Sequence, residues 1–170
     1  MNAIQFILTS VNGLHQAMVS DIKTLTPEQL KWKPAPKANP VLFLFWHAAR
    51  VEDNSVSGWQ KKSSIWEEDR WYEKMGLDAK VYGTGFGEAD VDKIAKLPLN
   101  LVIDYAEKVF RNSASYIQSL DADKLDFAPN TERPNWTIGM MINNFVIAHG
   151  WWHLGEIRYV KGLQGMPAPR

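Results

Sequence analysis

The sequence predicts an all-α protein, most simply a four-helix bundle. Two observations predict this class. Four segments carry apolar residues at steps of three or four, which is the spacing of one helix face. No segment shows the alternation of apolar and polar residues that is typical of a strand. The 170 residues are enough for one core, so a single domain is predicted over residues 1–170.

The first helix is predicted over residues 3–25 and the second over residues 40–57. A proline opens the second segment, where it suits the first turn of a helix, and Asn39 can cap that turn. Two prolines within residues 31–39 exclude a regular helix there. Thr26-Pro27-Glu28 before them is typical of a cap and the first turn of a short helix.

The third and fourth helices are predicted over residues 98–120 and 137–161. About forty residues, 58–97, separate the second helix from the third. Within them we expect a short helix at 65–75 and an irregular, glycine-rich stretch at 81–89. A connection of this length suits a bundle with one crossover, or a functional lid.

Composition excludes several classes of function. Nineteen basic residues balance nineteen acidic ones, so a nucleic-acid partner is not expected. The chain has no cysteine, which excludes disulfides, cysteine-ligated zinc, iron–sulfur clusters and a protein thiol nucleophile. The first ten residues lack the basic segment of a signal peptide, and the longest strongly apolar run, 41–46, is too short to span a bilayer. We therefore expect a cytoplasmic protein without a membrane partner.

Three of the four histidines form a candidate metal site. His149 and His153 are four residues apart, so both imidazoles lie on one side of the fourth helix beside its apolar stripe. His47 is on the apolar side of the second helix and is the best third ligand. Three imidazoles with an open position are typical of a catalytic site, and imidazole suits zinc, nickel, copper or iron.

The three histidines also have an alternative interpretation that involves no metal. They could be hydrogen-bonded polar residues in a bundle core or a dimer seam. A zinc protease of the HExxH class is disfavoured, because Gly150 stands where that motif has its glutamate.

Five stretches of the sequence together resemble a known family pattern. They are Leu30-Lys-Trp-Lys-Pro34, Phe45-Trp-His47-Ala-Ala-Arg-Val-Glu52, Trp136-Thr137-Ile138, Ala148-His149-Gly-Trp-Trp-His153-Leu-Gly-Glu156-Ile-Arg158 and Gly162-Leu-Gln-Gly165. With them the chain resembles the DinB/YfiT-like metalloenzyme family over nearly its whole length. Residues 58–97 are the least specific part of the match.

The resemblance implies a four-helix bundle with up-down-down-up topology and a long crossover between helices 2 and 3. It also implies a divalent metal held by His47, His149 and His153, and a homodimer. Characterised members of the family are thiol-cofactor S-transferases and a mycothiol-dependent maleylpyruvate isomerase. For the metal we expect zinc or nickel, and for the cofactor a low-molecular-weight thiol.

The favoured function is therefore a metal-dependent enzyme that transfers a thiol cofactor to a small electrophilic substrate. The metal would lower the pKa of the thiol. One alternative is a metal-binding or small-ligand-binding stress protein without turnover, and another is a metal-assisted hydrolase. A fourth protein ligand, such as His15 or Glu156, would close the site and favour a structural role.

Glu156 follows His153 by three residues and is the candidate catalytic group, either orienting a ligand or acting as a general base. The alternative for Glu156 is an ion pair with Arg158 or Lys161. Asn54 lies two turns beyond the histidine of the second helix and is a candidate for contact with a bound ligand, or for an interhelical hydrogen bond.

His15 and Trp152 are the remaining pocket candidates. For His15, on the core face of the first helix, a buried histidine bonded to backbone or water is the alternative. Glu52 is about 140° around the helix from His47, so a cap or an interhelical ion pair suits it better than metal ligation. Trp66 and Trp71 in the crossover could form a pocket wall or a dimer face.

Overall fold

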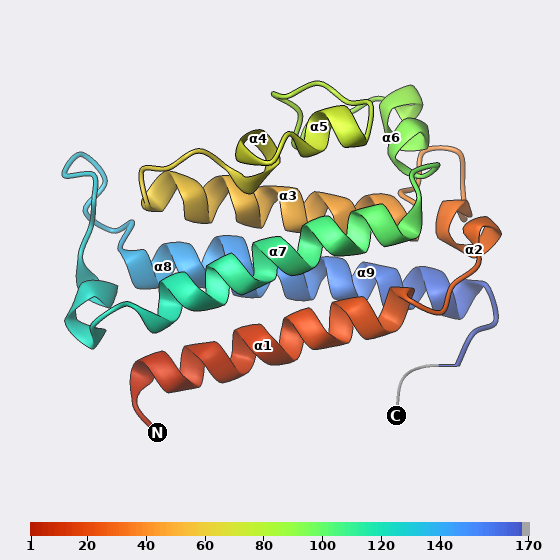
Figure 1. Ribbon diagram of the computed structural model, residues 1–170. Helices are drawn as coiled ribbons and strands as arrows, with labels where there is room; N and C mark the ends of the chain where they lie inside the picture. Colours follow the sequence, from red (N-terminus) through yellow and green to blue (C-terminus); the bar gives the residue numbers. More distant parts are fainter. Residues whose placement is uncertain (168–170) are drawn as a thin grey trace.

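The helical segments predicted by apolar spacing form the body of the protein (Figure 1). The computed structural model describes residues 1–167, and within them every regular element is a helix. The all-α class is therefore confirmed. The long helical segments are α1 (Ala3–Ile22), α3 (Val41–Trp59), α7 (Leu99–Gln118) and a last one composed of α8 (Ile138–Ile142), the π-helix η2 (Asn143–Ala148) and α9 (His149–Leu163).

Each long helix contacts two or more of the others along its length. α3 packs against α7 and α9, and α1 packs against the same two helices. In Figure 1, α1 and α8–α9 run in one direction while α3 and α7 run in the opposite one. The core between them contains fully buried Phe45, Trp46 and Tyr105. Each side chain of this size stabilises the fold by about 2–3 kcal/mol through burial of apolar surface.

The ends of the helices differ from the sequence prediction in detail. Thr137 caps α8 as its position suggests, because its hydroxyl accepts a hydrogen bond from the Met140 amide at 3.2 Å. Before α3, however, Pro40 and not Asn39 occupies the N-cap position. Gly58 lies inside α3, and α9 likewise continues to Leu163. Neither helix stops at its glycine, because glycine lowers helix propensity by only about 1 kcal/mol.

The crossover covers one side of α3 and is more helical than predicted (Figure 1). The helix expected over residues 65–75 is two short helices, α4 (Ile65–Glu68) and α5 (Trp71–Lys74). Arg70 separates them with a left-handed backbone, φ 55°. A further helix, α6 (Glu88–Ile94), begins at the end of the stretch predicted to be irregular. Smaller elements are α2 (Pro27–Lys31) and the 3-10 helix η1 (Ala122–Asp126).

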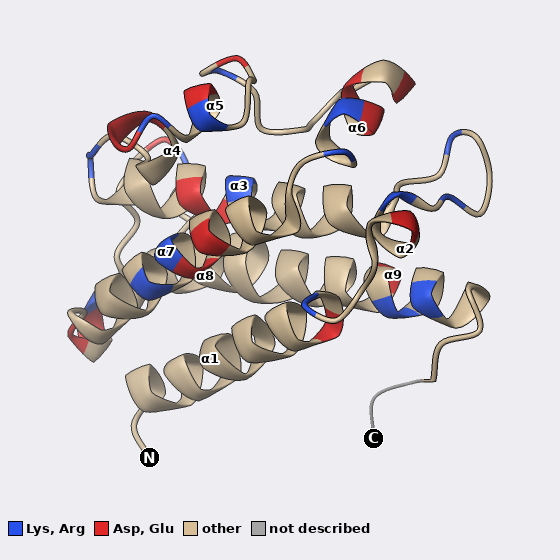
Figure 2. Cartoon of the chain, turned by 45° about the vertical axis from the view of Figure 1, so that its right-hand side comes forward, with Lys and Arg blue, Asp and Glu red and all other residues tan. Residues whose placement is uncertain are grey.

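The distribution of charged residues and the apolar character of the helices bear on the expected partners. Figure 2 shows Lys and Arg interspersed with Asp and Glu over α5, α6, α7 and α9, while the visible surface of α1 is almost free of charge. None of the helices within residues 1–167 combines the length and apolar character that crossing a membrane requires.

Candidate metal centre

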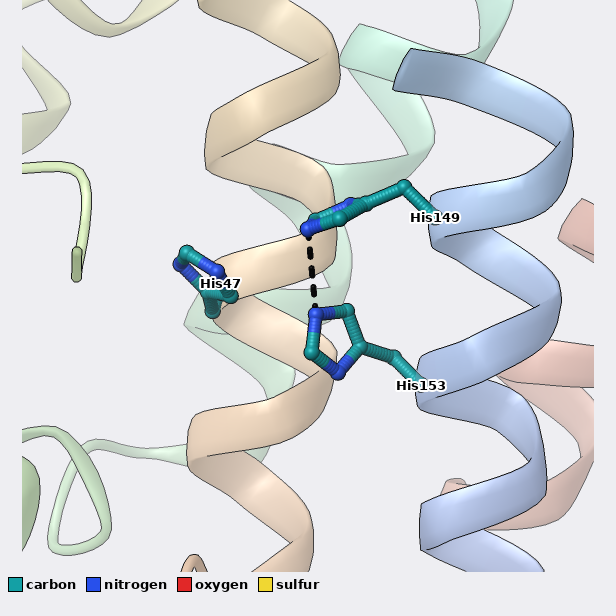
Figure 3. Close-up of side chains that lie close together, drawn as sticks. All are labelled: His47, His149 and His153. Carbon is teal, nitrogen blue, oxygen red and sulfur yellow. Dashed lines mark hydrogen bonds between the residues drawn. The ribbon is translucent and has the colours of Figure 1, made fainter. Parts of the chain in front are cut away.

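His47, His149 and His153 lie together between α3 and α9 (Figure 3). Each offers one ring nitrogen to a cluster in which these atoms lie within 4.8 Å of one another. The centroid of the His47 ring is 5.3 Å from that of His149 and 5.1 Å from that of His153. Two helices far apart in sequence thus bring three imidazoles to one point.

The hydrogen bonds of two of these rings determine which nitrogen carries the proton. His47 Nδ1 donates to the Tyr82 carbonyl oxygen at 2.7 Å, because a carbonyl can only accept. His153 Nδ1 donates to Glu156 Oε2, also at 2.7 Å. Both rings therefore direct an unprotonated Nε2 into the cluster.

His149 completes the cluster with its own Nε2, which lies 3.1 Å from His153 Nε2. Its buried Nδ1 has no hydrogen-bond partner among the residues that the structure describes. Two ring nitrogens that face each other at this distance need a proton or a cation between them, since their lone pairs otherwise repel.

Burial favours the neutral form of two of these imidazoles, His47 and His149. It lowers the pKa of His149 to about 4, with repulsion from His153 and His47 as the next causes. Burial also lowers the pKa of His47, although the Tyr82 carbonyl opposes the effect. The pKa of Glu156 is lowered by its hydrogen bond from His153. At neutral pH His47 and His149 are therefore neutral beside the Glu156 carboxylate, and metal binding requires neutral rings of this kind.

The donor set fits a divalent ion. Ligand nitrogens of a tetrahedral zinc site lie about 3.3 Å apart, since each is about 2.0–2.1 Å from the ion. The 3.1 Å between the Nε2 atoms of His149 and His153 agrees with that spacing. Imidazole nitrogens also suit nickel, copper and iron. Glu156 bonds to the Nδ1 side of His153, so it orients this ring from outside the cluster.

A cavity of about 280 Å³ adjoins the cluster. This volume is close to the lower limit for small-molecule sites, which is about 300 Å³. Asn54, one of the candidates from sequence, is among the residues around it. The lining residues are His47, Val51, Asn54, Ser55, Tyr82, Thr84, Phe145 and His149.

Two other sequence candidates lie elsewhere. His15 lines a separate groove of about 350 Å³, together with Phe110 and other residues of α1 and α7. Its Nε2 bonds to Glu52 Oε2 at 3.1 Å, which is the interhelical pair considered for Glu52. Trp152 is 74% exposed and is absent from the lining of both cavities. In the crossover, Trp66 and Trp71 are buried in the core.

The structure adds residues that sequence reasoning did not select. Tyr82 acts through its backbone carbonyl, and Arg50 reaches the same loop at the neighbouring Val81 carbonyl. Gly83 lies directly against His47. The run of glycines at positions 83, 85 and 87 was the available signal, because glycine marks close approach of a backbone to another group.

The helix that carries His149 changes its winding just before that residue. Asn143–Ala148 form a π-helix of six residues between α8 and α9. Such a segment holds more residues per turn than an α-helix, and it often occurs at functional sites. This segment sets the rotation of α9 relative to α8, and with it the side on which His149 and His153 face α3.

These features define an all-helical protein with a three-histidine cluster of metal-binding character. A family model of the DinB superfamily matches residues 14–157, and the chain belongs to this superfamily, whose members generally bind a metal ion. The fold is similar to that of a conserved protein from Enterococcus faecalis, with a TM-score of 0.81 and 21% identity over 96% of this chain and 97% of that chain. Among curated proteins no sequence matches. The family resemblance inferred from sequence is confirmed.

Proposed function

We propose that the protein is a divalent-metal-dependent enzyme that acts on a small molecule bound beside the histidine cluster. The observation that carries this proposal is the convergence of three imidazoles beside a cavity of about 280 Å³. His47, His149 and His153 would hold zinc or nickel. A divalent ion bound there would supply Lewis-acid chemistry, lowering the pKa of a bound thiol or water.

The protein's own groups have separate tasks in this proposal. Glu156 orients His153 through the 2.7 Å hydrogen bond, and Tyr82 does the same for His47 through its carbonyl. Asn54 and Thr84 offer polar contacts to a substrate in the cavity, and Phe145 offers an apolar one.

The reaction we favour is transfer of a low-molecular-weight thiol to a small electrophile. The chain contains no cysteine, so a sulfur nucleophile would have to arrive with a cofactor. The protein groups would bind and align the thiol and the electrophile.

We also propose that the four long helical segments of the chain have up-down-down-up topology and that the protein works as a homodimer. The helix directions in Figure 1 support the topology. An exposed apolar stripe on α9, formed by Trp152, Tyr159 and Leu163, supports the dimer, because interfaces are enriched in aromatic residues. Sedimentation velocity of the wild type and of Trp152→Glu tests the dimer. The cytoplasmic location stays a prediction.

The experiment for the metal site is metal analysis by mass spectrometry, using protein purified without a histidine tag. We expect about one zinc or nickel ion per chain in the wild type, and a loss of most of it in His47→Ala and in His149→Ala. A wild type that takes up neither metal, even when metal is added, would refute the proposal.

A second measurement separates the reaction classes. The metal-loaded protein is incubated with low-molecular-weight thiols and small electrophiles, and separately with esters and amides. Thiol adducts that form with the wild type and not with His149→Ala support the transferase. Hydrolysis without thiol consumption would identify a metal-assisted hydrolase instead.

A further inference from the structure

Three polar residues on successive turns of α3 attach the crossover to the bundle. His47, Arg50 and Asp53 are spaced by three residues, so they follow one side of the helix. The fully buried carboxylate of Asp53 accepts hydrogen bonds from the amides of Ile65 and Trp66, each at 2.9 Å. Asp53 thereby holds the first turn of α4, near the start of the crossover.

Arg50 attaches the crossover to α3 a second time, at Val81. Its Nε and Nη2 both donate to the Val81 carbonyl oxygen, at 3.2 and 3.1 Å. Its Nη1 donates to Asp53 Oδ2 at 3.3 Å and to the Tyr105 hydroxyl at 3.2 Å. The residue is 3% exposed, so the guanidinium is fixed on all sides. The Val81 carbonyl cannot shift without breaking two partly buried, charge-assisted hydrogen bonds.

The next two residues of the loop contact the metal-site histidine of α3. The Tyr82 carbonyl accepts the hydrogen bond from His47 Nδ1 at 2.7 Å. Gly83 has φ +94°, and a Cβ atom added there would lie 2.6 Å from His47 Nδ1 and 3.1 Å from Trp46 Cζ3. Only a glycine allows the backbone to pass this close to the ring.

We propose that Arg50 and residues 81–83 form a clamp that positions His47 as a metal ligand. Because the Tyr82 carbonyl only accepts, it keeps the proton of His47 on Nδ1 and leaves Nε2 free for the cluster. Arg50 fixes the carbonyl of the preceding residue, and Gly83 lets the loop reach the ring. In this role Arg50 is a positioning residue, since it acts through Val81 and not on a ligand.

The clamp is also part of the cavity wall. Tyr82 and Thr84, on either side of Gly83, line the cavity beside the cluster. A molecule in this cavity therefore contacts the same backbone that orients His47. The inference rests on the proposed metal site for its purpose, although the orientation of His47 can be measured without any metal.

Two glycines of the same loop give a matched test. Gly83 and Gly85 both have positive φ, +94° and +78°, so alanine strains the backbone at either position. An added Cβ at Gly85 meets no described atom within 4 Å, whereas at Gly83 it meets His47. We expect Gly83→Ala to weaken zinc affinity by about 10- to 100-fold relative to Gly85→Ala, at a temperature where both variants are folded. Equal zinc affinities of the two variants would overturn the clamp.

Arg50→Lys tests the other half of the clamp. Lysine keeps a positive charge near Asp53 but lacks the planar fork that reaches the Val81 carbonyl twice. We expect zinc affinity to fall by about 10-fold, with the variant still folded. An affinity equal to that of the wild type would exclude a positioning role for Arg50.

Imidazole nitrogen shifts, measured by NMR on the metal-free protein, separate this inference from the proposed function. We expect His47 to carry its proton on Nδ1 in the wild type, and Gly83→Ala to produce a mixture of the two tautomers. A wild-type His47 protonated on Nε2 would refute the clamp. If the wild type binds neither zinc nor nickel, the proposed function fails while this measurement still decides the clamp.

Discussion

His15 and His153 are each hydrogen-bonded to a glutamate, but the two pairs have different surroundings. His15 on α1 bonds through Nε2 to Glu52 on α3 at 3.1 Å, and both side chains are buried. His153 bonds through Nδ1 to Glu156, three residues later on the same helix, at 2.7 Å. The Glu156 side chain is 55% exposed.

The difference lies in what the rest of each imidazole contacts. The His15 ring is stacked on Phe110, with a centroid distance of 3.9 Å and an interplanar angle of 8°. His153 instead directs its second nitrogen at His149, 3.1 Å away. The first pair joins helices within the packed core, whereas the second orients a ring toward the other histidines of the cluster. A histidine–glutamate pair is therefore informative about chemistry only together with the group that the remaining nitrogen faces.

The largest expected effect on stability comes from breaking the buried pair. Glu52→Ala leaves His15 without its partner and opens a cavity, so the free energy of unfolding should fall by about 3 kcal/mol. Urea denaturation measures it. Glu52→Gln keeps the volume and an acceptor, and it should cost less than half as much. Zinc affinity should stay within about threefold of the wild type. If Glu52→Ala lowers the free energy of unfolding by less than about 1 kcal/mol, the buried pair does not have the structural role that distinguishes it from His153–Glu156.

The pH dependence of stability sharpens the comparison at the histidine cluster. Burial first, then repulsion from His153 and His47, lowers the pKa of His149 from 6.5 to about 4. Between these values the unfolded chain binds more protons than the native state. The free energy of unfolding of the metal-free protein should therefore fall as pH decreases from about 6.5 to about 4, and this contribution should level off below. Denaturation at several pH values should show a shallower slope for His149→Ala; equal slopes would contradict the assignment.

The smallest effect is expected for Glu156→Gln. The amide oxygen can still accept from His153, but without a charge, so zinc affinity should fall by about 10-fold, or about 1.4 kcal/mol. Stability should change by less than about 0.5 kcal/mol, because the side chain is half exposed. Glu107→Gln, in an exposed pair with Arg111 on α7, is the matched control and should leave zinc affinity unchanged. If both variants bind zinc with the affinity of the wild type, the charge of Glu156 does not contribute to zinc affinity.

Apolar spacing and turn chemistry were enough to predict the long helices, because these signals repeat over many residues. The pair His149 and His153 could be recognised for the same reason, since a spacing of four places both rings on one helix face. The position of His15 shows the limit of this reasoning. Spacing places it on the buried side of α1, but it does not say which neighbouring helix the ring meets.

Features that depend on backbone groups could not be predicted from residue type. Tyr82 contributes a carbonyl oxygen, which every residue has, so its side chain gives no signal. The left-handed turn at Arg70 divides a segment whose composition suits one helix. Short elements such as α6 have too few residues for a periodic pattern to stand out.

The π-helix Asn143–Ala148 makes the cluster depend on the winding of a segment that contributes no histidine to it. If all six residues were wound as an ordinary α-helix, α8 and α9 would be turned by about 100° relative to each other, because a π-helix turns less per residue than an α-helix. The buried face of α8, which includes Ile138 and Ile142, and the histidines of α9 could then no longer both keep their places. Over evolutionary time this segment can lose one residue and become an ordinary α-helix while α8 and α9 keep their relative rotation, because five α-helical residues turn through about the same angle as six π-helical ones.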